Sequence, residues 1–215
     1  DVYKRQAPQA LREADVVVAF GSDAALADLR ACAAPHARFV GYGTKGSVGY
    51  VAREALTEAR GAGALARRGA RDVLLYDAEG CLSMHAVFVE TGGAVTPRHF
   101  AALLAEGARS AAVEFPPGRP DEARRASVAA ARDRGVFARA EGFGDALGPP
   151  DASWLILYNE RADWPPPFLP RTTIVVPVAT PGEAEAYLRA QGLPLEGFAL
   201  APSKPRSDVL SLIHI

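Results

Sequence analysis

The chain has 215 residues, with 24 Lys and Arg against 25 Asp and Glu, and 49% of its residues are hydrophobic. This length can bury one sizeable core or two modest ones. Nothing in the formal net charge of −1 indicates binding to nucleic acid or to an acidic membrane. No apolar run approaches the roughly 20 residues of a membrane helix, so the composition is that of an ordinary globular protein.

The two ends of the chain are related at the level of DNA. Residues 1–6, DVYKRQ, can be encoded by a string whose reverse complement encodes residues 210–215, LSLIHI. This relationship is typical of the mosaic ends of a sequencing-library transposon, and such segments are excluded from fold reasoning. We therefore expect residues 7–209 to be an internal fragment of a longer gene product.

The first elements in chain order predict a parallel α/β unit. Residues 15–20, DVVVAF, are a short β-branched run that ends at a glycine turn. An Ala-rich helix follows, in which Leu26, Leu29 and Cys32 share one face. A second strand is expected at ARFVGYG, residues 37–43, and this order of strand, turn, helix and strand is the repeating unit of α/β proteins.

The middle of the chain predicts a helix, a strand and a second helix. Residues 51–75 are rich in Ala and Leu and are expected to be helical, with a break near residues 61–63, GAG. A buried strand is expected at residues 86–90, AVFVE. A helix is expected at residues 97–110, since its leading proline suits a first helical turn.

The last third of the chain continues the alternation. A helix capped at Asp121 or Pro120 follows a proline-rich loop. Three strands are expected, SWLILYNE at 153–160, TTIVVPVAT at 172–180 and LEGFAL at 195–200. A helix, PGEAEAYLRAQG at 181–192, is expected between the last two strands. Strands alternating with helices throughout predict an α/β fold, a mostly parallel sheet with flanking helices.

Cys81 is the first candidate for chemistry. It follows a glycine and lies between a helical segment and a strand, where a thiolate can act as a nucleophile and form a thioester. The alternative is that it packs as a small buried residue, as Cys32 is expected to do on its helical face. Two cysteines without regular spacing predict no disulfide framework and favour a reducing, cytosolic setting.

The histidines give weaker signals. His85, four residues after Cys81, can be read as a base, as a substrate contact or as a structural residue of the strand. His36 and His99 do not combine with it or with the cysteines into a metal-ligand spacing, so no metal site is expected.

Two glycine-rich segments suggest phosphate binding to different degrees. Gly21 and Ser22 form a turn at a helix start, where backbone N–H groups and the helix dipole suit a phosphate. Many such turns use glycine only for its backbone freedom. The segment GYGTKGSVG, residues 41–49, does not match the pattern GxxxxGK[ST], so a nucleoside-triphosphate loop is not expected.

Three segments in order, VVVAFGSDAAL, RFVGYGTKGSVGYVARE and DVLLYDAEGCLSMHAVFVE, resemble the acyl-CoA reductase family of the aldehyde dehydrogenase superfamily. This family includes the fatty-acid reductase of bacterial luminescence. The resemblance is most specific around Tyr76-Asp77 and Gly80-Cys81. It implies an aldehyde-dehydrogenase-like fold, with residues 7–42 as the C-terminal part of the dinucleotide-binding domain and residues 43–209 as a truncated catalytic domain.

The resemblance also implies a reaction, the reduction of an acyl-CoA thioester to an aldehyde with NADPH or NADH. Cys81 matches the nucleophile that carries the acyl group, His85 matches a histidine often present there, and Gly21 and Ser22 match the turn near the cofactor pyrophosphate. The expected setting is cytoplasmic, as the cysteine usage favours, and the oligomeric state of the full-length protein is left open, with a homo-oligomer among the alternatives. The chain alone is not expected to turn over, because the nicotinamide site needs a further segment.

Departures from the wider superfamily narrow this reading and leave alternatives. Hydrolytic aldehyde dehydrogenases place a glutamate base where residues 40–46, VGYGTKG, hold no carboxylate, which favours a reductase. Their cofactor-ribose glutamate is also missing near residues 168–177, so no ribose contact is assigned. The alternatives are another enzyme of the superfamily, such as an aldehyde dehydrogenase or a phosphate-activated acyl reductase, and a catalytically silent binding or assembly domain of the same fold.

Overall fold

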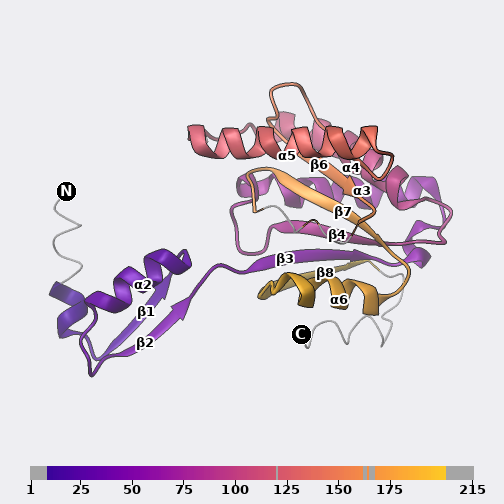
Figure 1. The fold of residues 1–215 in the computed structure, drawn as a ribbon. Helices are drawn as coiled ribbons and strands as arrows, with labels where there is room; N and C mark the ends of the chain where they lie inside the picture. Colours follow the sequence, from indigo (N-terminus) through magenta and orange to yellow (C-terminus); the bar gives the residue numbers. More distant parts are fainter. Residues whose placement is uncertain (1–8, 120, 162–163, 165–167, 202–215) are drawn as a thin grey trace. The chain divides into compact units, whose positions relative to one another are not determined.

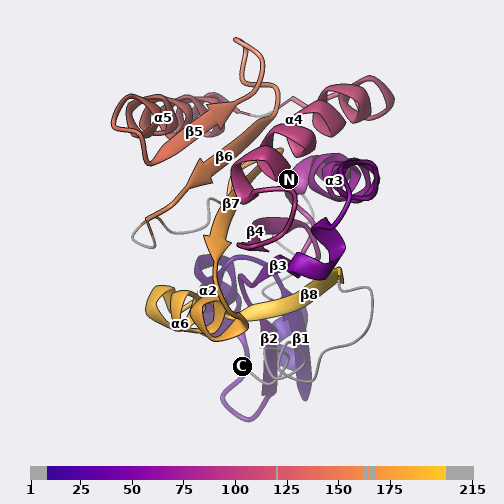
Figure 2. The ribbon, with the colours of Figure 1, turned by 90° about the vertical axis from the view of Figure 1, so that its right-hand side faces the viewer.

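The computed structural model describes residues 9–119, 121–161, 164 and 168–201. The two ends expected to derive from a transposon, residues 1–6 and 210–215, lie outside the described residues. The chain forms two compact units that meet in sequence between Lys45 and Gly46. Figure 1 labels most of the helices and strands of both units, and Figure 2 also labels β5.

The first unit contains a short helical segment at residues 9–13, followed by a strand, a helix and a strand. Strand β1 (Val16–Phe20) pairs in parallel with β2 (Arg38–Tyr42), and α2 (Asp23–Cys32) connects them. The side chain of Ser22 accepts a hydrogen bond from the Ala25 N–H and so caps α2. The predicted order of elements is confirmed here.

One face of the first unit's sheet is covered and the other is bare. Val17 and Ala19 are buried, whereas Phe20, on the alternate face, is 76% exposed, as are more than half of Val16 and Val18. The Phe20 ring stacks on that of Tyr42, with ring centroids 4.7 Å apart. Parallel sheets are normally covered on both faces. Within this unit only the face with Val17 and Ala19 is covered, and the face with Phe20 is apolar and exposed.

The second unit is built on a six-stranded sheet in the order β5-β6-β7-β4-β3-β8. Its strands are β3 (Gly46–Val51), β4 (Met84–Glu90), β5 (Gly144–Leu147), β6 (Leu155–Asn159), β7 (Thr172–Val178) and β8 (Leu195–Ala201). All neighbouring strands are parallel except β5 and β6, which are antiparallel. The predicted α/β fold with a mostly parallel sheet is confirmed.

Four helices cover the two faces of this sheet. They are α3 (Ala59–Leu74), α4 (Pro97–Glu114), α5 (Glu122–Ala140) and α6 (Pro181–Gln191), with two short 3-10 helices, η1 (Arg53–Leu56) and η2 (Leu75–Ala78). Figure 2 shows α3 and α4 on one face and α5 and α6 on the other. Two apolar cores fill the space between, one under each pair. In the described part of the chain, no helix is long and apolar enough to span a membrane.

The predicted break in the helix near residues 61–63 is wrong. Helix α3 runs unbroken through this segment, and its buried side chains Ala62, Ala66 and Ala70 recur every four residues. This face packs against α4, and tertiary packing outweighs the low helix propensity of glycine. The prediction also carried helix into Val51, which instead ends a strand.

Two strands were not predicted. All residues of β3 are buried, but its sequence GSVGYV carries two glycines, which are poor strand formers. Its extended form comes from pairing with β4 on one side and β8 on the other. The four-residue β5 lies at the sheet edge, where it pairs with β6 and packs against α5.

Candidate active site

Cys81 lies in the loop that leads into the central strand of the large sheet. Residues 76–83, called the nucleophile loop after the role predicted for Cys81, begin within η2, turn at Gly80 and Cys81, and end where β4 starts at Met84. The Ser83 N–H donates to the Gly80 carbonyl at 2.9 Å, which closes this turn. Cys81 is exposed. Its place between a helical segment and a strand is the one predicted, and it is not packed in the core.

Ser47, at the start of β3, holds the loop from the neighbouring strand. Its hydroxyl donates a 2.7 Å hydrogen bond to the Cys81 carbonyl oxygen. Gly197 of β8 packs closely against this contact. A Cβ on Gly197 would lie 2.7 Å from Ser47 Oγ and 2.9 Å from Leu82 Cδ2. A cavity of about 160 Å³, lined in part by Ser47, Leu82, Met84 and Gly197, opens beside this junction. The amino ends of three parallel strands therefore meet around the Cys81 main chain.

His85 is buried in β4. Its ring lies 4.5 Å, centroid to centroid, from the ring of Phe168, at an angle of 43°. Phe168 precedes β7 and also limits β3, since a Cβ on Gly46 would lie 2.9 Å from its ring. The buried, ring-packed position suits the structural reading of His85, and a role in proton transfer stays a prediction. Among the described residues, no three His, Cys, Asp or Glu side chains gather into a possible metal site.

In the first unit, Gly21 and Ser22 form the turn between β1 and α2, and both are exposed. The Gly21 N–H donates to the Tyr42 carbonyl at 3.2 Å. The Ser22 oxygen accepts from the Ala25 N–H at 3.2 Å, which leaves its own hydroxyl proton to donate. A negative group at this helix start would therefore meet the Ser22 hydroxyl and the positive end of the α2 dipole.

Asp23 brings a carboxylate to residues 40–46, the segment that contains no acidic residue of its own. Its Oδ1 accepts from the Thr44 N–H at 3.1 Å. Gly43 is required at this contact, because a Cβ there would lie 2.2 Å from the same oxygen. The residues of this segment carry no acid themselves, and the one that reaches them comes from 21 positions earlier.

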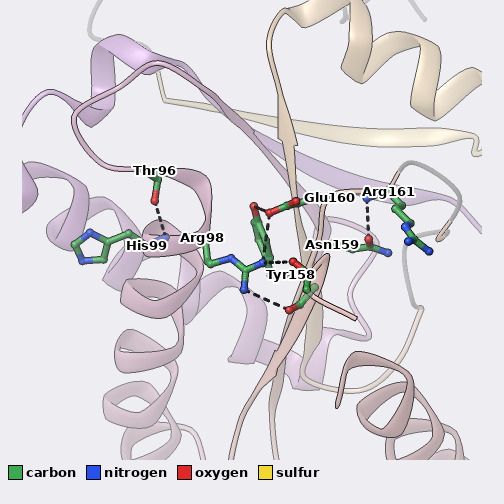
Figure 3. A network of polar contacts seen from close by, with 9 residues as sticks. Thr96, Arg98, His99, Tyr158, Asn159, Glu160 and Arg161 are labelled. Carbon is green, nitrogen blue, oxygen red and sulfur yellow. Dashed lines mark hydrogen bonds and ion pairs between the residues drawn. The ribbon is translucent and has the colours of Figure 1, made fainter. Parts of the chain in front are cut away.

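A second polar network lies at the carboxyl end of β6 (Figure 3). Arg98, in the first turn of α4, donates to the Gly142 carbonyl at 3.2 Å and to Glu160 at 3.4 Å. The Tyr158 hydroxyl donates to Glu160 at 3.0 Å, and burial, together with this carboxylate, raises the pKa of Tyr158 to about 12. Because β6, β7 and β4 run parallel, this network lies at the carboxyl ends of the strands, whereas Cys81 lies at their amino ends. It joins α4 to β6 and does not contact the loop that carries Cys81.

Solved structures of aldehyde dehydrogenases share this fold. The chain is similar to aldehyde dehydrogenase KauB from Pseudomonas aeruginosa, with a TM-score of 0.66, 14% identity and coverage of 94% of this chain and 47% of that one. For an NAD-dependent aldehyde dehydrogenase from Burkholderia multivorans the values are 0.64, 17%, 99% and 40%. For the indole-3-acetaldehyde dehydrogenase AldA of P. syringae, solved as a mutant with NAD+ and IAA, they are 0.62, 14%, 95% and 48%. The chain thus spans less than half the length of each of these proteins.

The family is established by sequence. No curated protein matches the chain. The family model described as acyl-CoA reductase (LuxC) matches residues 3–211, a span that takes in the turn at Gly21 and the whole nucleophile loop. With an aldehyde-dehydrogenase fold and an exposed Cys81 at the amino end of its central strand, the chain belongs to the acyl-CoA reductase (LuxC) family.

Proposed function

We propose that this chain carries the nucleophile of an enzyme that reduces an acyl-CoA thioester to an aldehyde with NADPH or NADH. The observation that carries the proposal is the exposed Cys81, whose main chain is fixed by Ser47 at the amino ends of the strands. A thiol that is accessible and held in one place meets the two demands of covalent catalysis, access and orientation.

Cys81 acts in two steps. In the first, its thiolate sulfur forms a bond to the thioester carbonyl carbon, the carbon–sulfur bond to coenzyme A breaks, and the departing thiolate takes up a proton. The Cys81 N–H stabilises the oxyanion that forms on the way, and one such donor in a dry site contributes roughly 3 kcal/mol. In the second step, after reduction of the acyl group, the bond from carbon to Cys81 sulfur breaks and the aldehyde leaves.

The cofactor is proposed to meet the turn at Gly21 and Ser22. When bound, NADPH or NADH supplies the hydride that reduces the acyl group. The exposed turn fits a pyrophosphate through the Ser22 hydroxyl and the start of α2, while the Gly21 N–H already donates to Tyr42. The neighbouring Asp23 carboxylate accepts from the Thr44 N–H, which offsets part of its negative charge at this turn.

The segment 40–46 supports reduction over hydrolysis. An acyl-enzyme is hydrolysed when a carboxylate base activates water, and this segment holds none of its own. An acyl group on Cys81 would then persist until it is reduced. Aldehyde oxidation with water as the second nucleophile is the competing reaction within the same fold.

The test is consumption of NADPH or NADH by the full-length enzyme with a series of acyl-CoA substrates, alongside Cys81→Ala. The proposal expects cofactor oxidation with one free coenzyme A released per turnover, and loss of both in the variant. A second assay supplies aldehyde with NAD+ or NADP+ and measures the free acid. Acid formation without acyl-CoA reduction would replace the proposal by an aldehyde dehydrogenase. A folded protein that is inactive in both assays would make the domain a catalytically silent one.

A further inference from the structure

The nucleophile loop begins with a stretch of strained backbone. Tyr76, Asp77 and Ala78 have φ values of 53°, 55° and 58°, which is the left-handed helical region. Non-glycine residues enter this region singly and at a cost, because the Cβ crowds the following carbonyl. Three in a row need contacts that hold them, and strain of this kind concentrates at functional sites.

The contacts come from Arg171, which lies 94 positions later in the sequence and just before β7. Its main-chain N–H donates to the Asp77 carbonyl at 2.8 Å. Its side-chain Nη1 donates to Asp77 Oδ1 at 2.9 Å. Arg171 itself is only 3% exposed and also has a positive φ, 48°. The middle residue of the strained stretch is therefore bound through both its main chain and its side chain.

The same guanidinium joins three further segments. It donates to the main-chain carbonyls of Ser153 at 2.8 Å, Phe115 at 2.8 Å and Leu74 at 3.4 Å. The second oxygen of Asp77 accepts from the Gly118 N–H at 3.0 Å. A Cβ on Gly118 would lie 2.4 Å from that oxygen, so a side chain at this position would displace the Asp77 carboxylate. Asp77 is thus fixed against the loop after α4 and the segment before β7, and Arg171 links both to the end of α3.

We propose that Arg171 and Asp77 are positioning residues for Cys81, and this rests on the proposed role of that thiol. Four positions separate Asp77 from Cys81. The pair fixes the start of the nucleophile loop, and the Ser47 hydroxyl fixes the carbonyl of Cys81. With both ends bound, the strained stretch has one conformation, and Cys81 is presented in one place.

The Arg171–Asp77 pair joins a buried guanidinium to a carboxylate whose side chain is 30% exposed, and such a pair is a poor source of stability alone. Removing an arginine and a carboxylate from water costs free energy, and the attraction between them often offsets no more than this cost. The directed hydrogen bonds of a guanidinium, in contrast, select one geometry. The chain offers a matched comparison, because Arg53 donates to the fully buried Glu90 at 2.9 Å. That pair lies at the carboxyl end of β4, and Cys81 lies before its amino end.

The first test relieves the strain in the full-length enzyme. Tyr76→Gly removes a side chain that is 78% exposed and puts glycine at a position that favours it. We expect the melting temperature to stay level or rise, while kcat for acyl-CoA reduction falls about 10- to 100-fold with KM within about threefold. Ala152→Gly, at φ 51° and outside the loop, is the control and should leave kcat unchanged. A Tyr76→Gly enzyme with the parental kcat would overturn the proposal.

The second test removes the donors. Arg171→Met should lower kcat by a similar factor in the folded protein, whereas Arg53→Met should lower the melting temperature and leave kcat unchanged. Amide hydrogen exchange gives a readout that does not need turnover. The proposal expects faster exchange confined to residues 76–83 in both Tyr76→Gly and Arg171→Met, with β4 still protected. Unchanged exchange in the loop would refute the positioning role even if the parental enzyme reduces no acyl-CoA, an outcome that would separately remove the proposed function.

Discussion

The Ser47 hydroxyl and the Cys81 carbonyl oxygen are joined by a 2.7 Å hydrogen bond across 34 positions of sequence. Ser47 is buried, so solvent water does not replace this hydrogen bond when the hydroxyl is removed. We expect Ser47→Ala to lower the free energy of unfolding by about 1 kcal/mol, the net value of one hydrogen bond. It should also slow acylation of Cys81, measured as coenzyme A released in a single turnover of the full-length enzyme.

Ser110→Ala is the control for this substitution. The Ser110 hydroxyl also donates to a main-chain carbonyl, that of Glu106 at 3.3 Å, but on the exposed surface of α4. A change there should stay within about 0.5 kcal/mol and leave acylation unchanged. Equal acylation rates in Ser47→Ala and the parental enzyme would contradict a role for Ser47 in holding the loop.

The two cysteines are predicted to differ in alkylation. Cys81 is exposed in a loop, whereas Cys32 is partly buried on α2. Because the reagent has to reach the sulfur, we expect iodoacetamide to modify Cys81 first in the folded protein, as followed by peptide mass spectrometry. In denaturant the two rates should approach each other. Faster modification of Cys32 in the folded state would argue against an accessible nucleophile.

The parts of the fold that the sequence predicts are those with a local signal. The apolar runs of β1, β4 and β7 identify strands, and Asp121 marks the start of α5 because its side chain accepts from the Arg124 N–H. Strand β3 escaped prediction because its glycine-rich sequence becomes extended only between two partner strands. The unbroken α3 escaped prediction because its glycines are outweighed by packing against α4.

The candidate site divides in the same way. Cys81 can be found from its neighbours in sequence, because a cysteine after glycine at the start of a buried strand is a local pattern. Its supports cannot, since Ser47 is 34 positions away and Arg171 contacts the loop from 94 positions away. The left-handed stretch at Tyr76 to Ala78 has no glycine to announce it. Such a conformation depends on tertiary contacts that single-sequence patterns do not encode.

Two glycines distinguish close helix packing from open surface. A Cβ on Gly107 of α4 would lie 3.0 Å from Arg67 Cα and from Ala70 Cβ of α3, whereas a Cβ on Gly61 meets nothing within 4 Å. We expect Gly107→Ala to destabilise the protein by about 1–3 kcal/mol through overpacking. Gly61→Ala should stabilise it by about 0.5–1 kcal/mol through helix propensity. Denaturant unfolding of both variants checks this, and a stabilised Gly107→Ala would show that α3 and α4 do not approach so closely.

Tyr158 predicts a stability change at high pH. Burial and the Glu160 carboxylate raise its pKa in the folded protein to about 12, against 10.0 for the ordinary side chain. Between these values the folded state keeps a proton that the unfolded state releases, so the free energy of unfolding falls as pH rises from about 10 to about 12. We expect Tyr158→Phe to remove this part of the decline, measured by urea unfolding across that range. Tyr42→Phe, with a half-exposed ring, is the control and should keep the decline. An equal slope in Tyr158→Phe and the parental protein would show that burial and the Glu160 carboxylate do not keep the proton on the Tyr158 hydroxyl in the folded state.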